Sequence, residues 1–444
     1  MFGDIVQIIN DAQGQGTTVA QRVQQRRQRL IELIAQEYPD KKGTVFLCAP
    51  IEPDHATFLQ DSSFWYFSAI SEPATVLTFG FQEPTTLYQP FFGDVREKWV
   101  QAVDVVYEHT KQLYGIDELK HTGSRLATYT VDPYFAPADY QQVIEYLQDM
   151  VARKQYIFTL YPTHTRSYAH VRYVFDRLAL FVPGLMQYVV DISALVTKLR
   201  RKKDMYEIEM MYQSIAITNA AFQAAAHVIR PDGLESEVQA AIEYIFTENK
   251  AGRAYPSIVA SGKRSTVLHY NVNNETLLAG DVVLIDAGAM YQHYCADITR
   301  VFPVSGTFSK RQKELYEIVL ETQMHVVDHV QPGMWLSNPD KPDMSLQHIA
   351  LNFLKQYGYD QYFIHGIGHH LGLDVHDVGS RSEPLAEGDV ITIEPGIYIP
   401  QEGIGIRIED NYWVIADSDP VCMSEDIPKT IDAIEEIVQQ KFEM

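Results

Sequence analysis

The stretch Glu387–Gly396, EGDVITIEPG, decides the fold because it combines a strand signal with an acid in an apolar context. Residues Val390–Ile393 are β-branched and mostly apolar, and they therefore favour a buried strand. Glu394 then stands where a core residue is expected. Earlier in the chain, Ala279–Gly288 reads AGDVVLIDAG and carries Asp286 at the matching position. The chain thus contains the same acid-ended strand twice.

The elements around these two strands also repeat. Each copy has the pattern of a long helix, a second helix, a loop and a strand pair. In the first copy these elements cover residues 199–229, 234–252, 281–290 and 293–304. In the second copy they cover residues 309–330, 344–358, 389–399 and 403–415. We therefore predict an α+β domain over residues 188–444, in which two pseudo-symmetric halves close around one site.

The chain before residue 183 has a different pattern. Helix and strand signals alternate there, which predicts a separate α/β domain over residues 1–183. This part contains no dense cluster of histidines and acids, so its sequence indicates little chemistry. Residues 17–37, TTVAQRVQQRRQRLIELIAQE, form a basic amphipathic helical stretch. We expect it to present a solvated helix face rather than a nucleic-acid site.

Composition limits the class of protein. The 444 residues are 46% hydrophobic and 21% charged, which fits a globular chain with two cores. A formal net charge of -22 argues against a nucleic-acid partner. The N-terminus lacks the basic region of a secretory signal, and no apolar stretch approaches the ~20 residues of a membrane span. We therefore expect a cytoplasmic protein without a membrane partner. Its three cysteines are expected to be buried thiols: Cys48, Cys295 and Cys422.

Four acids of the two strand pairs form a candidate metal site. Asp286 and Asp297 lie eleven residues apart, and a short turn would bring them together across the ladder. Glu394 and Glu409 lie fifteen residues apart, again one on each strand, and Arg407 shares the face of Glu409. Convergent carboxylates protonate or bind cations, because repulsion and desolvation disfavour their charged forms. Two divalent ions would balance the four charges.

The segment His365–Gly379, HGIGHHLGLDVHDVG, adds a dense group of imidazoles before the second strand pair. Its glycines allow close approach of the backbone. His269 stands at the matching place in the first copy. Oxygen ligands suit Mn, Mg or Ca, and one imidazole shifts the choice towards Mn, Co, Zn or Fe. The histidines of this segment are His365, His369, His370 and His376.

Residues 188–420 resemble the pita-bread metallopeptidases, the family of methionine aminopeptidase, prolidase and aminopeptidase P. Five stretches in the family order carry the resemblance: SIVASGKRSTVLHY, DVVLIDAGAMYQHYCADITR, HGIGHHLGLDVHDVG, ITIEPGIYI and GIGIRIED. DVHDVG and GIRIED point to the proline-specific branch. Residues 61–79, DSSFWYFSAISEPATVLTF, resemble the N-terminal domain of aminopeptidase P. The resemblance implies an N-terminal creatinase-like α/β domain followed by a pita-bread catalytic domain.

The resemblance also implies a dinuclear metal centre. Asp286 would chelate one ion, and His369 and Glu394 would bind the other. Asp297 and Glu409 would bridge both ions. Glu394 would in addition act as general base for a metal-bridging hydroxide. Mn is the first choice of metal, with Co, Zn and Fe as alternatives.

Further residues match family positions that do not bind metal. Arg407 would hold Glu409 or a substrate group by charge-assisted hydrogen bonds, and Tyr398 would line the site. Relatives often have an aromatic or apolar residue in place of His370. We expect His370 to line the pocket, and a role as an alternative metal ligand is the second choice. Three histidines would orient the scissile carbonyl and stabilise the tetrahedral intermediate: His269, His365 and His376.

The resemblance predicts a peptidase that hydrolyses the bond between an N-terminal residue and a following proline. Ordinary aminopeptidases handle this bond poorly, because proline has no N–H and fixes the local backbone. An Xaa-Pro dipeptidase (prolidase) is the alternative, and a non-catalytic pita-bread binding protein is a distant one. The expected substrates are peptides with proline at the second position. The family resemblance further implies a homodimer or homotetramer.

Overall fold

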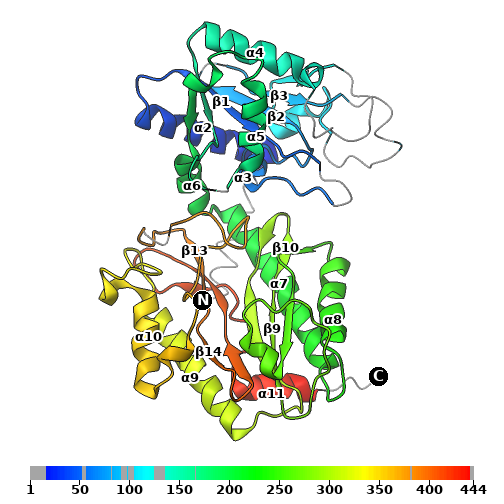
Figure 1. Cartoon of the computed structure of the whole chain (residues 1–444), viewed down its shortest axis with the longest axis vertical. Coiled ribbons are helices and arrows are strands. Elements are labelled where there is room, and N and C mark those ends of the chain that lie inside the picture. Colours follow the sequence, from blue (N-terminus) through cyan, green and yellow to red (C-terminus); the bar gives the residue numbers. More distant parts are fainter. Residues whose placement is uncertain are drawn as a thin grey trace. The chain divides into compact units, whose positions relative to one another are not determined.

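The computed structural model describes residues 17–440 with the exception of 53–56, 82, 92–97, 99–104, 125–135, 166 and 381–382. The chain forms two compact units that divide between Arg200 and Arg201 (Figure 1). Both units combine helices and strands, so the chain is a mixed α/β protein.

The first unit contains a six-stranded sheet in the order β4-β3-β2-β1-β5-β6. The sheet is mixed, because β1 is antiparallel to β2 and parallel to β5. The pairing of β6 with β5 places residues 189–191 in this sheet, beyond the domain boundary expected between residues 183 and 188. The strands are β1 (Gly43–Cys48), β2 (Val76–Gly80), β3 (Thr86–Gln89), β4 (Glu118–His121), β5 (Tyr156–Thr159) and β6 (Val189–Asp191).

Helices surround this sheet, with α2, α4 and α5 close to its strands in Figure 1. Their bounds are α2 (Val19–Glu37), α3 (Ser62–Ser68), α4 (Gln141–Ala152), α5 (Ala169–Leu178) and α6 (Ser193–Arg201). The aromatic residues at the start of the stretch 61–79 form α3, which is buried from Ser63 to Ser68.

Helix α2 has a solvated face, but most of its basic residues are not on it: Arg22, Arg26 and Arg27 are buried, whereas Arg29 and the glutamines are exposed. Arg27 donates hydrogen bonds to the carbonyl oxygens of Phe67 at 2.8 Å and Gly115 at 2.7 Å. Arg26 lies 4.0 Å from the centroid of the Tyr66 ring and donates to the Tyr66 carbonyl. Phe67 and Tyr66 are in the last turn of α3, where carbonyl groups lack helical partners and attract cations. The arginines of α2 therefore join elements within the unit.

The predicted long helix over residues 199–229 is interrupted. Helix α6 ends at Arg201 and α7 (Met205–Val228) begins after Asp204. The Asp204 side chain accepts a hydrogen bond from the Glu207 backbone N–H, and the Glu207 side chain accepts one from Asp204 N–H. This capping box starts a new helix, because it satisfies amide groups that would otherwise lack partners.

The second unit repeats the predicted order of helices and strands. Helices α7 and α8 precede the strands of the first half, and α9 and α10 precede those of the second. Figure 1 shows α8 on one side of the central strands and α9 and α10 on the other. The remaining helices are α8 (Glu235–Glu248), α9 (Lys310–Val327), α10 (Leu346–Tyr357) and α11 (Ile431–Gln439).

Antiparallel strands from both halves meet at the centre of the second unit. β9 lies between β8 and β12, and β16 lies between β13 and β17. An isolated bridge between Thr299 and Glu409 links the two halves. The strands are β7 (Gly252–Arg253), β8 (Ile258–Ser261), β9 (Val282–Ala287), β10 (Ala289–Tyr291), β11 (Tyr294–Cys295), β12 (Ile298–Pro303), β13 (Val390–Ile393), β14 (Gly396–Ile399), β15 (Ile404–Arg407), β16 (Asp410–Trp413) and β17 (Val421–Cys422).

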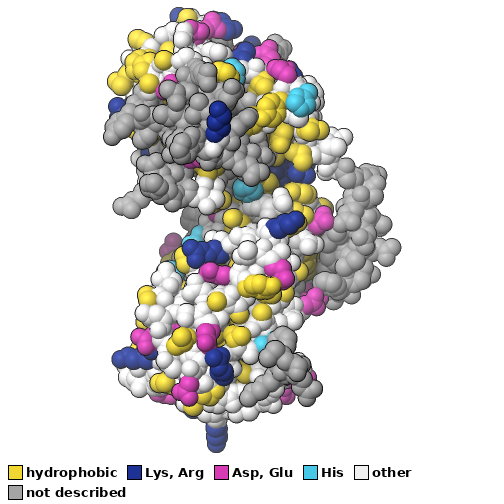
Figure 2. Space-filling model, turned by 90° about the vertical axis from the view of Figure 1, so that its right-hand side faces the viewer, with side chains coloured by type: hydrophobic (Ala, Val, Ile, Leu, Met, Phe, Trp, Pro, Cys, Tyr) yellow, Lys and Arg dark blue, Asp and Glu magenta, His cyan; other side chains and the backbone are white. Residues whose placement is uncertain are grey.

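On the face drawn in Figure 2, acidic, basic and apolar side chains are interspersed. Cys48 and Cys295 are buried free thiols, as predicted, whereas Cys422 is half-buried. Among the described helices, none combines the length and the apolar composition needed to cross a membrane.

Candidate metal centre and active site

One cavity of about 640 Å³ in the second unit collects the candidate residues. Its walls also include apolar side chains such as Ile258, Leu268 and Val375. Its size is that of a small-molecule or peptide site. All nine predicted catalytic and metal-binding residues line it: His269, Asp286, Asp297, His365, His369, His376, Glu394, Arg407 and Glu409.

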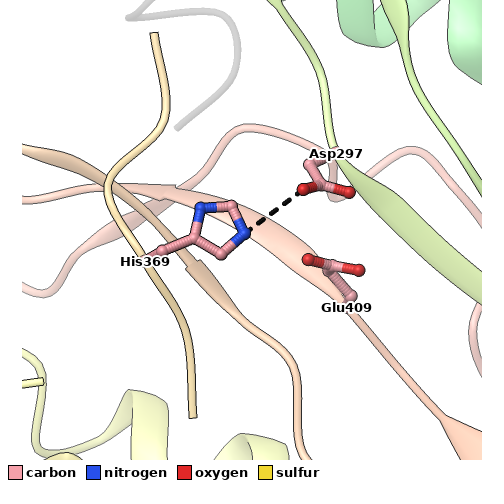
Figure 3. Close-up of side chains that lie close together, drawn as sticks. All are labelled: Asp297, His369 and Glu409. Carbon is pink, nitrogen blue, oxygen red and sulfur yellow. Dashed lines mark ion pairs between the residues drawn. The ribbon is translucent and has the colours of Figure 1, made fainter. Parts of the chain in front are cut away.

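Asp297, His369 and Glu409 form the tightest group of donors. One side-chain donor atom from each lies within 4.8 Å of the others. Figure 3 shows the His369 ring directed at Asp297, with Glu409 beside them. His369 Nε2 is 3.3 Å from Asp297 Oδ2, and its Nδ1 is 3.0 Å from the carbonyl oxygen of His370. The carbonyl contact on Nδ1 leaves Nε2 facing the acids, as in histidines that bind metal.

The first strand pair brings Asp286 and Asp297 together, but not through a short turn. Asp286 lies in β9 opposite Thr299 of β12, and Asp297 immediately precedes β12. The strands β10 and β11 form a separate hairpin between them. The hydroxyl of Tyr255 contacts Oδ1 of each acid at 2.5 Å. One half-buried tyrosine therefore contacts both carboxylates.

Tyr255 is a site residue that the sequence did not reveal, because no pattern distinguishes it from the other tyrosines. We expect Tyr255→Phe to weaken binding of Mn²⁺ about 10- to 100-fold, since outer partners orient ligating carboxylates. Isothermal titration calorimetry of the metal-free protein measures this affinity. Tyr244→Phe, at an exposed position on α8, is the matched control. An affinity within twofold of that of the parent protein would remove Tyr255 from the site.

The second strand pair places Glu394 and Glu409 at one end of its ladder. Ile393 at the end of β13 pairs with Asp410 at the start of β16, so the two glutamates are the next residues outward. Glu394 Oε1 is 3.5 Å from His369 Nε2 and accepts a hydrogen bond of 3.1 Å from the Thr392 hydroxyl. Glu394 thus faces the same imidazole as Asp297.

Arg407 lies closer to Asp286, an acid of the first half, than to Glu409, which is two residues further along the chain. Its Nη2 donates to Asp286 Oδ2 at 2.5 Å, whereas Glu409 Oε2 is 4.0 Å from its Nε. Nε donates instead to the Thr299 hydroxyl at 3.0 Å, and Thr299 donates to Glu409 at 2.6 Å. The predicted direct hold on Glu409 is therefore indirect. Thr299 lies two residues after Asp297, and this spacing places both side chains on one face of a strand. The spacing could therefore have identified Thr299 as a residue of the site.

Three histidines of the cavity contact neighbouring aromatic or imidazole rings. His365 Nε2 is 2.7 Å from the hydroxyl of Tyr398, which also accepts from Arg407 at 2.9 Å. The rings of His376 and His369 are 4.2 Å apart. Tyr398 therefore supports the site from behind, since it is not among the described residues that line the cavity.

His370 is buried away from the cavity, and both roles predicted for it are wrong. It is 3% exposed and is absent from the described lining of the cavity. Its backbone bridges to Ile391, and its ring packs so closely on Gly379 that a Cβ there would lie 2.1 Å from it. Successive residues of this extended segment point in opposite directions, so His369 and His370 cannot both face the acids.

Burial disfavours the charged forms of three acids in the cavity. Burial raises the pKa of Glu394 to about 7 against the influence of His369, and it also raises the pKa of Asp286. Burial, followed by the charge of Asp297, holds the pKa of Glu409 well above its usual range. A divalent ion would offset both desolvation and repulsion. Carboxylate oxygens with one imidazole are donors that fit such an ion.

Several proteins similar to this chain are named Xaa-Pro peptidases. Xaa-Pro aminopeptidase 3 of Homo sapiens is 32% identical over 94% of this chain and 85% of its own length. The Xaa-Pro aminopeptidase of Haemophilus influenzae is 36% identical over 56% of this chain, and the Xaa-Pro dipeptidase of Pyrococcus furiosus is 42% identical over 50%. The matched region spans just under two thirds of the latter two proteins, 64% and 63%.

Solved structures of aminopeptidase P match nearly the whole chain. Aminopeptidase P II of Yersinia pestis has a TM-score of 0.78 and 27% identity, and the match covers 94% of this chain and 99% of that one. An Escherichia coli aminopeptidase P in complex with substrate has a TM-score of 0.77 and 27% identity, with 94% and 98% covered. The model of metallopeptidase family M24 matches residues 209–416. The predicted family is therefore confirmed, and the chain belongs to metallopeptidase family M24.

Proposed function

We propose that this protein is a metal-dependent aminopeptidase that releases the N-terminal residue from peptides with proline at the second position. The observation that carries the proposal is one cavity lined by four carboxylates and four histidine side chains of the predicted set. The near full-length similarity to Xaa-Pro aminopeptidases supports the substrate class. An Xaa-Pro dipeptidase shares similarity over only 50% of this chain.

Five residues would hold the metal: Asp286, Asp297, His369, Glu394 and Glu409. Four carboxylates match the charge of two divalent ions, and Mn is our first choice, with Co, Zn or Fe as alternatives. When bound, such ions act as Lewis acids and activate water. The hydrogen bonds from Tyr255, Thr299 and Arg407 would set the direction of the carboxylate oxygens before the metal arrives.

The other residues of the cavity would act on the peptide. Glu394 would take the proton of the attacking water, since its carboxylate faces the cavity and is held by Thr392. His269, His365 and His376 would orient the scissile carbonyl and stabilise the negative charge that it gains. The contacts of His365 Nε2 with the Tyr398 hydroxyl and of its Nδ1 with the Gly366 carbonyl would fix the orientation of the His365 ring.

The remaining assignments rest on the resemblance to the family. We assign the first unit, predicted over residues 1–183 and extended by β6, to a creatinase-like domain, and the second unit, predicted over residues 188–444, to a pita-bread catalytic domain. Matches with aminopeptidase P structures over 94% of the chain support this layout. A homodimer or homotetramer and a cytoplasmic location complete the proposal.

The test compares an Xaa-Pro-Xaa tripeptide with the matching Xaa-Pro dipeptide on Mn-loaded enzyme. We expect kcat/KM for the tripeptide to be at least about tenfold higher, with cleavage after the first residue. Removal of metal by a chelator should abolish hydrolysis, and Mn²⁺ should restore it. Mass spectrometry of the products identifies the cleaved bond.

The other outcomes separate the alternatives. A preference for the dipeptide would make the protein a prolidase. Hydrolysis that survives complete removal of metal would contradict a metal-dependent mechanism. No hydrolysis of either peptide by metal-loaded protein would favour a binding protein on the same fold.

A further inference from the structure

Glu235 is a fully buried carboxylate outside the metal centre that collects five hydrogen bonds. It is the first residue of α8 and has 0% exposure. Its Oε1 accepts from the backbone N–H and the hydroxyl of Ser261, each at 2.9 Å, and from Arg264 Nε at 2.9 Å. Its Oε2 accepts from the Tyr270 hydroxyl at 2.8 Å and from the Glu275 N–H at 3.1 Å. So many donors hold the Glu235 carboxylate in one position.

These five donors stand at both ends of one segment, residues 261–275. Ser261 and Arg264 belong to its start, in β8 and the 3-10 helix Gly262–Thr266, and Tyr270 and Glu275 belong to its end. Residues 267–275 form no helix or strand ladder, so their path depends on side-chain contacts. Glu235 therefore clamps a segment that backbone pairing does not hold.

The clamped segment forms one wall of the cavity. Leu268, His269 and Asn271 line the cavity, and His269 directly precedes Tyr270. The outer side of the segment is open, since Val267 is 53% and Val272 is 63% exposed. Because packing on that side is too weak to hold the segment, the hydrogen bonds to Glu235 fix its position.

Asn273 provides a second anchor next to the clamp. Its side chain is 1% exposed, accepts from Val259 N–H at 2.9 Å and donates to the Ser257 carbonyl at 2.7 Å. It also donates to Gln239 of α8 at 3.0 Å. The segment is thus tied at its far end to the same helix that carries Glu235.

We infer that Glu235 is a positioning residue that holds His269 at the reacting carbonyl of the substrate. The inference rests on the proposed peptidase function and deepens it. None of the five donors to Glu235 is a predicted metal ligand, so loss of the clamp should displace His269 while metal binding persists. A group that acts on the transition state lowers kcat when it is displaced and leaves KM nearly unchanged.

The experiment places Glu235→Ala and Glu235→Gln in the full-length, Mn-loaded enzyme. Glutamine can still accept on one side, but its NH₂ group faces the Glu275 N–H, so we expect kcat to fall about tenfold, and about a hundredfold for alanine. Bound Mn should stay within twofold of the parent value. Tyr270→Phe removes one bond beside His269 and is the milder variant if the others fail to fold. Glu248→Gln, at the exposed end of α8, should leave kcat unchanged.

A double-mutant cycle with His269→Ala separates positioning from general damage. If Glu235 acts through His269, Glu235→Gln should lower kcat less than twofold further in the His269→Ala background. Losses that multiply independently would overturn the inference, as would a fall in bound Mn in proportion to kcat. Folded variants with unchanged kcat would overturn it too.

A readout without catalysis keeps this inference apart from the proposed function. The ¹³C–¹H resonance of the His269 ring, assigned with His269→Ala, reports its surroundings whether or not the protein cleaves peptides. We expect Glu235→Gln to shift this resonance and to speed amide exchange in residues 262–275. An unmoved resonance with unchanged exchange would refute the clamp even in an active enzyme. Shifts in a protein that cleaves no peptide would refute the proposed function alone.

Discussion

Glu394→Gln is expected to lower kcat for an Xaa-Pro tripeptide by about a thousandfold. An amide cannot accept the proton of the attacking water, whereas its oxygen can still accept the hydrogen bond that Thr392 donates to Glu394 Oε1 at 3.1 Å. The shape of the cavity is therefore retained while the base is lost. Steady-state kinetics on Mn-loaded protein, with metal content measured on the same sample, tests this expectation.

Two controls make the result specific to Glu394. Glu248→Gln removes a carboxylate from an exposed helical position and should keep the parent kcat. Metal analysis distinguishes a lost base from a lost ligand, because Glu394 is 3.5 Å from the neighbouring His369 and is predicted to bind metal as well. A kcat within tenfold of the parent value in fully loaded protein would assign the base to another residue.

Arg300→Met is expected to reduce the free energy of unfolding of the second unit by about 3–5 kcal/mol. Arg300 is fully buried, and its Nη2 lies 2.6 Å from Asp410 Oδ1. Its Nη1 donates to the carbonyl oxygens of Thr299 at 2.9 Å and Glu409 at 2.7 Å. The side chain therefore joins β12 of the first half to β16 of the second, directly behind the metal centre. Methionine leaves Asp410 and two carbonyl groups without this cation.

Urea unfolding of the full chain, followed by circular dichroism, measures the change. Arg253→Met is the matched control, because Arg253 forms an exposed pair with Glu243 at 3.4 Å and should cost less than about 1 kcal/mol. Adding Asp410→Asn to Arg300→Met should recover part of the loss, since the remaining buried charge is removed. Equal losses for Arg300→Met and Arg253→Met would show that the buried pair adds nothing to stability.

The sequence anticipated the strands well because strand signals are local. The β-branched runs before Asp286 and Glu394 form β9 and β13, and the acids stand at the ends that face the cavity. Periodicity failed at the start of α7, where it predicted continuous helix through Asp204. The capping pair Asp204 and Glu207 was present in the sequence, and its spacing signals a new helix start.

The sequence was less informative about polar side chains in the core. Arg26 and Arg27 have the helical spacing of a solvated basic face, yet they bind carbonyl groups forty or more residues away. His370 looks like its neighbour His369 in the sequence, but the extended backbone turns it to the opposite side. Burial of a polar group depends on the surface that packs against it, which local patterns do not encode.

By itself, the sequence determined the family, the duplicated order of the second unit and the nine residues that line the cavity, because these follow from acids and histidines at set distances from recognisable strands. The tertiary structure alone decided how those residues are held. Tyr255 reaches Asp286 and Asp297, Thr299 connects Arg407 to Glu409, and Glu235 clamps the segment of His269. Each of these hydrogen bonds joins residues far apart in the chain, and only the tertiary packing, within the first half or between the two halves, brings their donors and acceptors within bonding distance.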